Sequence, residues 1–155
     1  MSVAALLEAL RARGWTVTAA ESCTGGMVAA ALTDVAGSSD VFERGFVTYS
    51  NAAKREMLGV ADATLAAHGA VSEEVVLEMA RGAREAAAAD LAVAISGIAG
   101  PGGSEHKPEG RVCFGVATAE GTTTETVEFG ALGRGKVRAA ARDHALTRLM
   151  EALER

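Results

Sequence analysis

The sequence has little of what marks a nucleic-acid-binding, membrane or metal-binding protein. Lysines and arginines number 15 against 20 aspartates and glutamates, a net charge of −5, so a broad electrostatic contact with nucleic-acid phosphates is not expected. No apolar run approaches the roughly 18 residues that a membrane span requires. The two cysteines, Cys23 and Cys113, form no CxxC pair and no zinc-site pattern with the three histidines, which favours reduced thiols in a cytoplasm. We therefore expect a cytoplasmic protein whose partner is neither nucleic acid nor a membrane.

The composition is that of a globular chain. Hydrophobic residues make up 49% of the sequence and charged residues 23%, which excludes a disordered protein. A chain of 155 residues can bury a substantial core, and it contains no repeat and no long linker. The first residues, MSVAALLEALRARG, carry Glu8 and lack a cleavage site, so they indicate an amphipathic helix and not a signal peptide. We expect a single domain over residues 1–155.

Predicted helices and strands alternate along the chain. The helices are expected before Gly14, over 24–35, over 51–60 with Asn51 as the cap, from Ser72 to about Ala89, and from about Arg134 onward. The strands are expected over 15–20, 41–50 and 91–97, with a hairpin over 111–119 and 122–130. This order predicts an α/β fold, a three-layer α/β/α sandwich on a mixed, mostly parallel sheet with one hairpin.

Two glycine-rich loops follow predicted buried strands, at 21–26 and 97–103. In open α/β folds, ligands bind beyond the carboxyl ends of the strands, where loops lead into helices. The second of these loops continues as a long glycine- and proline-rich segment, and such loops in compact domains are usually functional. We therefore expect the ligand site where these two loops meet.

The loop 21–26 reads Glu-Ser-Cys-Thr-Gly-Gly. If the helix starts at Thr24 or Gly25, the free N–H groups of its first turn point into the loop and offer a site for an anion or an oxyanion. Gly25 and Gly26 would let a ligand approach the backbone closely. In the alternative interpretation, Ser22 or Thr24 merely caps the helix.

Lys54 lies among apolar neighbours in the stretch NAAKREML. Partial desolvation would lower the pKa of its amine and make it a possible base, and a lysine base beside a serine can activate the hydroxyl as a nucleophile. The alternative is a solvated surface lysine paired with Glu56 or Asp62.

Four segments, AESCTGG, GFVTYSNAAKREMLGV, GAVSEEVVLEMARGA and ISGIAGPGGSEHKPEGRVCFGVA, together resemble the CinA C-terminal domain family. The likeness runs over about residues 4–153, in the order of the family, and we expect the stand-alone form of the domain. The enzymatic members are nicotinamide mononucleotide deamidases. The resemblance therefore implies hydrolysis of the carboxamide of nicotinamide mononucleotide, which gives nicotinic acid mononucleotide and ammonia in pyridine nucleotide salvage.

The resemblance also implies roles for individual residues. It suggests a serine–lysine dyad of Ser39 and Lys54, with Tyr49 holding or relaying a proton. Ser22 would supply the oxyanion pocket or grip the substrate. Ser96, where the family commonly has threonine, would hydrogen-bond the substrate.

The choice of nucleophile stays open at this point. Ser22, Ser38 and Ser39 all lie in predicted loops, and Cys23 precedes a helix, whose N-terminus lowers the pKa of a thiol. No histidine is a recognisable partner for Cys23. We place Ser39 first, Ser22 second and Cys23 third.

The phosphate of the mononucleotide needs a cation, and basic residues gather at the start of the last predicted helix. Acids are favoured in a first helical turn, so an anion is needed to offset these cations. We expect Arg138 to be the phosphate contact, with Arg134, Lys136 and Arg142 nearby. The further substrate-binding candidates are Thr24, Gly25, Gly26, Asn51, Ser96, Gly97 and Gly100.

Two other functions compete with the deamidase. A CinA-like domain could keep a nucleotide pocket without catalysis, as a regulatory module. A metal-dependent phosphohydrolase would need clustered carboxylates, and the glycine-rich loops contain no DxD or ExxE pair. We expect neither a metal nor a cofactor, because a serine–lysine dyad needs none. We also expect a homo-oligomer, a dimer or larger.

Overall fold

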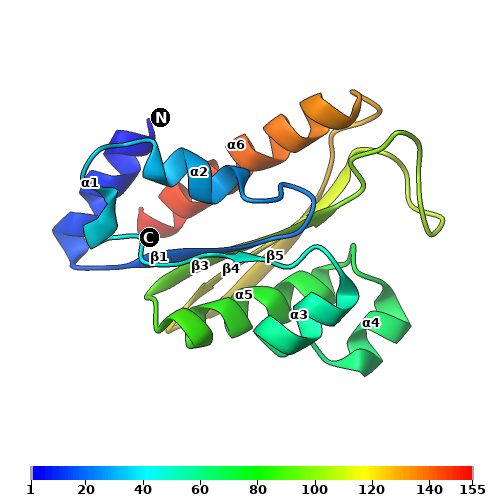
Figure 1. Ribbon diagram of the computed structural model, residues 1–155, viewed down its shortest axis with the longest axis horizontal. Coiled ribbons are helices and arrows are strands. Elements are labelled where there is room, and N and C mark those ends of the chain that lie inside the picture. Colours follow the sequence, from blue (N-terminus) through cyan, green and yellow to red (C-terminus); the bar gives the residue numbers. More distant parts are fainter. Residues whose placement is uncertain (1, 155) are drawn as a thin grey trace.

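A five-stranded sheet forms the centre of the computed structural model, which describes residues 2–154 (Figure 1). The strands are β1 (Val17–Glu21), β2 (Phe46–Val47), β3 (Leu91–Gly97), β4 (Arg111–Thr118) and β5 (Gly121–Glu128), in the order β2-β1-β3-β4-β5. β1 pairs in parallel with β2 and β3, whereas β4 is antiparallel to both β3 and β5. The predicted mixed sheet with one hairpin is confirmed. β4 alone runs against the other four strands, so parallel and antiparallel pairings are equally frequent.

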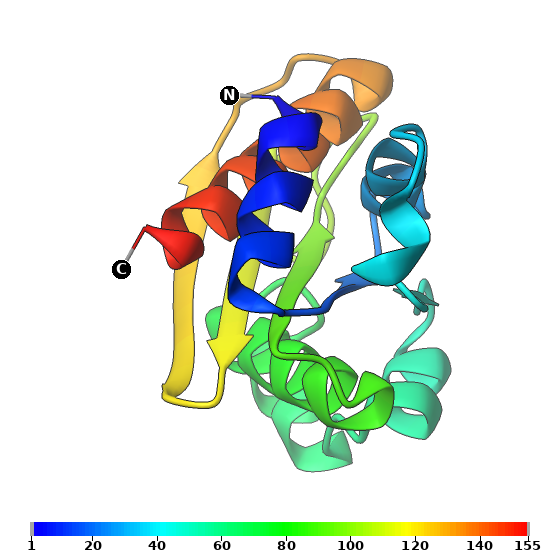
Figure 2. The same ribbon diagram turned by 90° about the vertical axis from the view of Figure 1, so that its left-hand side faces the viewer.

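Helices cover both faces of this sheet. They are α1 (Val3–Arg13), α2 (Met27–Thr33), α3 (Asn51–Leu58), α4 (Asp62–His68), α5 (Glu73–Ala87) and α6 (Arg134–Leu153). Figure 1 shows α1, α2 and α6 on one face and α3, α4 and α5 on the other, and Figure 2 shows the same layers from the side. The predicted three-layer sandwich is therefore confirmed. Within residues 2–154, no helix is long and apolar enough to cross a membrane.

The two faces of the central strands carry side chains of different size. In β3, Val93 and Ile95 pack into the cluster under α1, α2 and α6, whereas Ala92 and Ala94 pack into the cluster under α5. These small side chains let α5 approach the sheet closely. The same closeness is visible at Gly115 of β4, where a Cβ would lie 2.6 Å from a backbone oxygen of α5.

Two predicted elements are shorter than expected. The strand predicted over 41–50 is reduced to β2 and one isolated bridge between Val17 and Phe42. The helix predicted over 24–35 begins only at Met27, because Gly25 and Gly26 have φ values of +54° and +105°, which a right-handed helix does not contain.

The caps were predicted with mixed success. Ser72 caps α5 as predicted, its hydroxyl accepting from the backbone N–H of Val75. The cap of α3 is Ser50 and not Asn51, since the Ser50 hydroxyl accepts from the N–H of Ala53 at 3.0 Å. α4 was not predicted at all, and none of its residues is fully buried.

Candidate active site

A cavity of about 190 Å³ lies at the carboxyl ends of β1 and β3. Both glycine-rich loops reach it, and the end of β2 and the α4–α5 connection contribute as well. The residues that line it are Ser22, Cys23, Tyr49, Lys54, Ala70, Val71, Ser96, Gly97, Ile98, Ala99, Ser104, Glu105 and Arg134. The two loops predicted to form the site therefore do meet.

Lys54 is the most buried cation of the site, with 1% of its surface exposed. Its Nζ donates to Ser22 Oγ at 2.9 Å and to the backbone oxygens of Thr48 at 2.8 Å and Tyr49 at 3.3 Å. A neutral amine has two N–H groups and one lone pair. When both N–H groups bind the two backbone oxygens, the lone pair faces the Ser22 hydroxyl, which then donates to Nζ.

Burial lowers the pKa of Lys54 to about 8, because desolvation disfavours the charged ammonium. About a tenth of the amine is thus neutral at pH 7, far more than for an ordinary lysine, and this fraction can act as a general base. The alternative of a surface lysine is wrong, since Glu56 and Asp62 pair with Arg55 instead.

Glu21, the residue before Ser22, is a carboxylate that is 1% exposed. Its Oε1 accepts from Thr24 Oγ1 at 2.6 Å and from the N–H of Val28 at 2.9 Å, and its Oε2 accepts from the N–H of Ala29 at 3.0 Å. The prediction that free N–H groups of this helix face the ligand is therefore wrong for these two amides. Glu21 occupies the N-terminus of α2 from inside the protein, where a carboxylate is favoured by the helix dipole.

Thr24, Gly25 and Gly26 belong to the scaffold of the loop and are not among the lining residues. Thr24 is fully buried and its hydroxyl is bound to Glu21. The two glycines provide the turn that precedes α2.

Ser39 does not lie beside Lys54. It is exposed in a short 3₁₀ helix, Ser38–Asp40, which contacts the end of α1 through Arg11 and Asp40. Val41 follows this 3₁₀ helix. Its backbone oxygen accepts from the N–H of Val17, the first residue of β1. Ser22 lies five residues after Val17, about 16 Å away at the usual rise per residue. The structure thus pairs Lys54 with Ser22 and not with Ser39.

Cys23 lines the cavity but is 5% exposed. Burial raises the pKa of its thiol to about 11, so the thiolate is scarce at neutral pH. The expectation that the helix N-terminus lowers this pKa is wrong, because desolvation is the larger effect here.

The two arginines at the start of α6 have different partners. Arg138 donates from Nε to the Cys23 oxygen at 2.9 Å and from Nη2 to the Thr24 oxygen at 3.3 Å, so it fastens the loop 21–26. Arg134 lines the cavity and donates to the Gly100 oxygen at 2.6 Å and to Tyr49 Oη at 2.8 Å. Of the two, Arg134 faces the cavity, whereas Arg138, the predicted phosphate contact, is not a lining residue.

The remaining predicted contacts divide in the same way. Ser96 and Gly97 line the cavity, and Ser96 is 1% exposed. Gly100 reaches the site through its backbone oxygen. Asn51 is exposed at the start of α3 and is not a lining residue.

Sequence reasoning missed the backbone oxygens of Thr48 and Tyr49, since any residue type provides a carbonyl. It also missed the wall formed by Ala70 and Val71, whose side chains carry no chemical signal. The glycine- and proline-rich composition did indicate the loop that contributes Glu105 to the lining.

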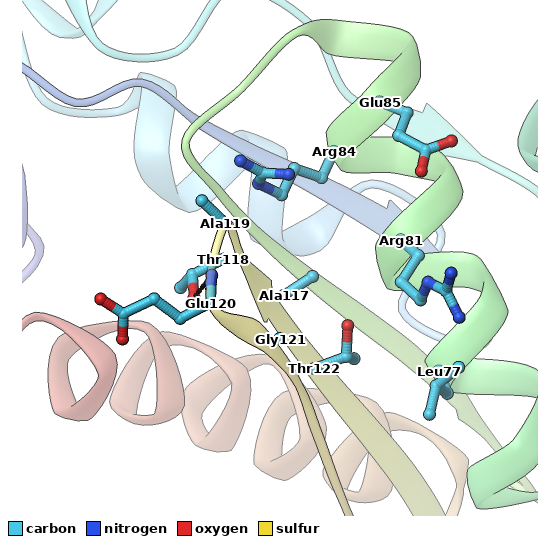
Figure 3. A pocket seen from close by; sticks show the side chains of 10 residues that line it. All are labelled: Leu77, Arg81, Arg84, Glu85, Ala117, Thr118, Ala119, Glu120, Gly121 and Thr122. Carbon is cyan, nitrogen blue, oxygen red and sulfur yellow. Dashed lines mark hydrogen bonds between the residues drawn. The ribbon is translucent and has the colours of Figure 1, made fainter.

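A larger hollow of about 370 Å³ lies at the other end of the sheet, between α5 and the β4–β5 turn (Figure 3). Arg81 and Arg84 extend into it from α5. It contains none of the predicted site residues, so size alone does not identify the chemical site.

Comparison with known proteins identifies the relatives of the chain. The family description "CinA C-terminal domain" matches residues 2–153. Nicotinamide-nucleotide amidohydrolase PncC of Escherichia coli K12 is 61% identical over 145 residues, which are 93% of this chain and 88% of that protein. A CinA-like protein of Syntrophobacter fumaroxidans is 49% identical over 147 residues, but these cover only 34% of its length.

Solved structures agree with this relationship. The competence/damage inducible protein CihA from Agrobacterium tumefaciens superposes with a TM-score of 0.94 at 45% identity, covering 99% of this chain and 93% of that one. A CinA superfamily protein from Klebsiella pneumoniae 700603 gives 0.93 at 42% identity and 99% coverage of both chains. The resemblance predicted from the four segments is confirmed, and the chain belongs to the CinA C-terminal domain family.

Proposed function

We propose that this chain hydrolyses the carboxamide of nicotinamide mononucleotide to nicotinic acid mononucleotide and ammonia, with Ser22 as nucleophile and Lys54 as base. The observation that carries the proposal is the 2.9 Å contact between the buried Lys54 Nζ and Ser22 Oγ at a cavity. The name of the Escherichia coli relative, 61% identical, supports the choice of substrate.

In this mechanism the neutral Lys54 accepts the hydroxyl proton of Ser22 as Oγ bonds to the carboxamide carbon. The C–N bond then breaks, and Lys54 returns the proton to the leaving nitrogen, which departs as ammonia. Water attacks the acyl-serine and Lys54 accepts a proton from it. The bond between the acyl carbon and Ser22 Oγ then breaks, Lys54 returns the proton to Oγ, and the acid product leaves as a carboxylate after releasing its own proton to solvent. No metal and no cofactor takes part.

Two further side chains would bind the substrate. Ser96 offers a buried hydroxyl at the cavity. Arg134 would exchange its contacts with Tyr49 and Gly100 for the phosphate, because a guanidinium binds two phosphate oxygens at once. Tyr49, 63% exposed, would then be free to contact the substrate at the rim.

The decisive experiment measures ammonia release from nicotinamide mononucleotide by the wild type, Ser22→Ala and Ser39→Ala, with and without EDTA. We expect Ser22→Ala to lose at least about 100-fold in kcat, with Ser39→Ala and the EDTA sample unchanged. Loss of activity in Ser39→Ala alone would refute the Ser22 assignment. Binding of the nucleotide without ammonia release would favour a regulatory module, and dependence on a divalent ion would refute the dyad.

Three broader expectations accompany this proposal: action in the cytoplasm, a role in pyridine nucleotide salvage, and assembly as a homo-oligomer of two or more copies. Light scattering of the purified protein tests the last of these.

A further inference from the structure

Lys107 belongs to the long glycine- and proline-rich loop, yet its ammonium binds a different part of the chain. Its Nζ donates to the His68 oxygen at 2.8 Å and to the Val71 oxygen at 2.6 Å. His68 ends α4, and Val71 lies between α4 and α5. A lysine at the end of a helix commonly binds the last carbonyl groups in this way, and hydrogen bonds from a charged donor are stronger than neutral ones.

The two segments that Lys107 joins both line the cavity. Ala70 and Val71 line it from the α4–α5 connection, and residues 98–99 and 104–105 line it from the loop. Lys107 therefore connects two of the segments that enclose the site containing Ser22 and Lys54.

Gly69 provides a second and independent observation at the same junction. Its φ is +75°, and a Cβ there would lie 2.8 Å from Glu105 Oε2 and 3.1 Å from Lys107 Nζ. A Cβ here would displace the ends of the Glu105 and Lys107 side chains, and the positive φ disfavours any residue with a side chain. The loop and the segment 69–72 therefore contact each other both through the hydrogen bonds of Lys107 and beside Gly69.

We propose that Lys107 is a positioning residue that pins the loop 98–110 to the segment 69–72 and so keeps the cavity closed around Lys54 and Ser22. The proposal rests on the proposed function in one respect, namely that this cavity is where deamidation takes place.

Closure of the cavity affects the pKa of Lys54. Lys54 owes its lowered pKa, about 8, to exclusion from water. When the pin is removed, water reaches the amine and its pKa rises toward the ordinary value of 10.5. At a fixed pH, less of the base is then neutral, and the substrate is held less well.

The experiment is an NMR titration of the lysine side chains in the free protein. The chain has only three lysines, Lys54, Lys107 and Lys136, so each ε-carbon signal is assigned by substitution. The wild type is compared with Lys107→Met, with Gly69→Ala, which keeps the Lys107 charge, and with Arg81→Met. The last removes an exposed charge at the far end of the sheet (Figure 3). Hydrogen exchange of 69–72 and 98–110 is measured in the same four proteins.

We expect the pKa of Lys54 to rise by about one unit or more in both Lys107→Met and Gly69→Ala, with the control unchanged. Exchange of both walls becomes at least about 10-fold faster, as expected for the loss of hydrogen bonds to a charged group. In the active enzyme, the midpoint of the pH profile of kcat/KM moves upward with this pKa, and KM rises. Lys107→Arg restores part of the wild-type midpoint and part of the wild-type KM.

A Lys54 titration and wall exchange unchanged in both variants would overturn the proposal. A shift in Lys107→Met but not in Gly69→Ala would overturn it too, because the lost charge alone would then explain the shift. A wild type that releases no ammonia refutes the proposed deamidation. The Lys54 titration and the hydrogen exchange would still test whether Lys107 holds the loop against the segment 69–72. Circular dichroism checks that each variant is folded. If Gly69→Ala is not folded, the proposal is tested with Lys107→Met alone.

Discussion

At the scale of the residue, the site depends on a lysine withdrawn from water and on the serine that it touches. Sequence reasoning identified Lys54 from its apolar neighbours, and the structure places Lys54 in the cavity. The family resemblance placed Ser39 before Ser22, whereas the structure places Ser22 beside Lys54. Residues 21–26 and 37–40 are both serine-containing loops, so no local pattern separates them. Only the path of the chain decides which of them reaches the carboxyl end of β1.

The pH dependence of catalysis follows from the lowered pKa of Lys54. The base must be neutral, so kcat/KM should rise about tenfold per pH unit below pH 8 and level off above it. A profile that is flat from pH 6 to 9 would contradict a lysine base. Lys54→Ala should lose at least about 100-fold on the plateau above pH 8, and its profile should lack the rise below it.

The stability of the fold should depend on pH through the same group. The pKa of Lys54 is about 8 in the folded protein against 10.5 for an ordinary lysine, so the unfolded chain binds more protons between these values. The free energy of unfolding of the wild type relative to Lys54→Met should therefore rise by about 3 kcal/mol between pH 8 and 10.5. Urea titrations at pH 7 and 11 check this, and a constant difference would show that Lys54 titrates normally.

The phosphate contact is tested by two arginines with different partners. Arg134→Met should raise KM for nicotinamide mononucleotide about 10-fold or more, with a smaller effect on kcat, and should scarcely affect the dephosphorylated riboside. Arg138→Met should harm both substrates alike, because Arg138 fastens the loop that carries Ser22. Equal losses on both substrates for Arg134→Met would move the phosphate site elsewhere.

At the scale of the element, local signals predicted α5 and α6 well and the segment 41–50 poorly. Ser72 with Glu73 and Glu74 is a strong helix start, and the structure agrees. The β-branched and aromatic residues of 41–50 indicated a strand, but only Phe46 and Val47 pair with β1 in the sheet. Strand formation needs a partner, and no local pattern contains one.

The contact between α3 and α5 yields a prediction about stability. A Cβ at Gly82 of α5 would lie 1.8 Å from the Leu58 oxygen of α3. Alanine is the better helix former by about 1 kcal/mol, yet the collision should dominate, and Gly82→Ala should lower the free energy of unfolding by about 2 kcal/mol or more.

Gly135 of α6 is the matched control, because nothing lies within 4 Å of the position of its Cβ. Gly135→Ala should raise the free energy of unfolding by about 0.5–1 kcal/mol. Denaturant titrations of both variants decide, and a stabilised Gly82→Ala would show that α3 moves away at little cost.

At the scale of the whole molecule, alternation and hydrophobic patterning predicted the layers, since each helix needs a face of the sheet to bury its apolar side. The same patterns could not predict that α4 lies beside α5, or that the α4–α5 connection lines the site. Such a placement depends on packing among small residues distant in the sequence.

The sheet should open from its edges inward. β3 lies between β1 and β4 and is buried from Leu91 to Ser96, whereas β5 is an edge strand. Backbone amides of β3 should therefore exchange most slowly, with a free energy of opening close to that of global unfolding, and those of β5 on its outer side much faster. Slower exchange in β5 than in β3 would indicate that another chain covers this edge.

The Lys54 amine is oriented by main-chain oxygens at positions 48 and 49. Every amino acid has such an oxygen, so substitutions at these two positions leave the acceptors present as long as the chain keeps its path. The direction of the lone pair is in this sense mutationally robust. The exposed side chain of Tyr49 can therefore be replaced without changing the direction in which the Lys54 lone pair points.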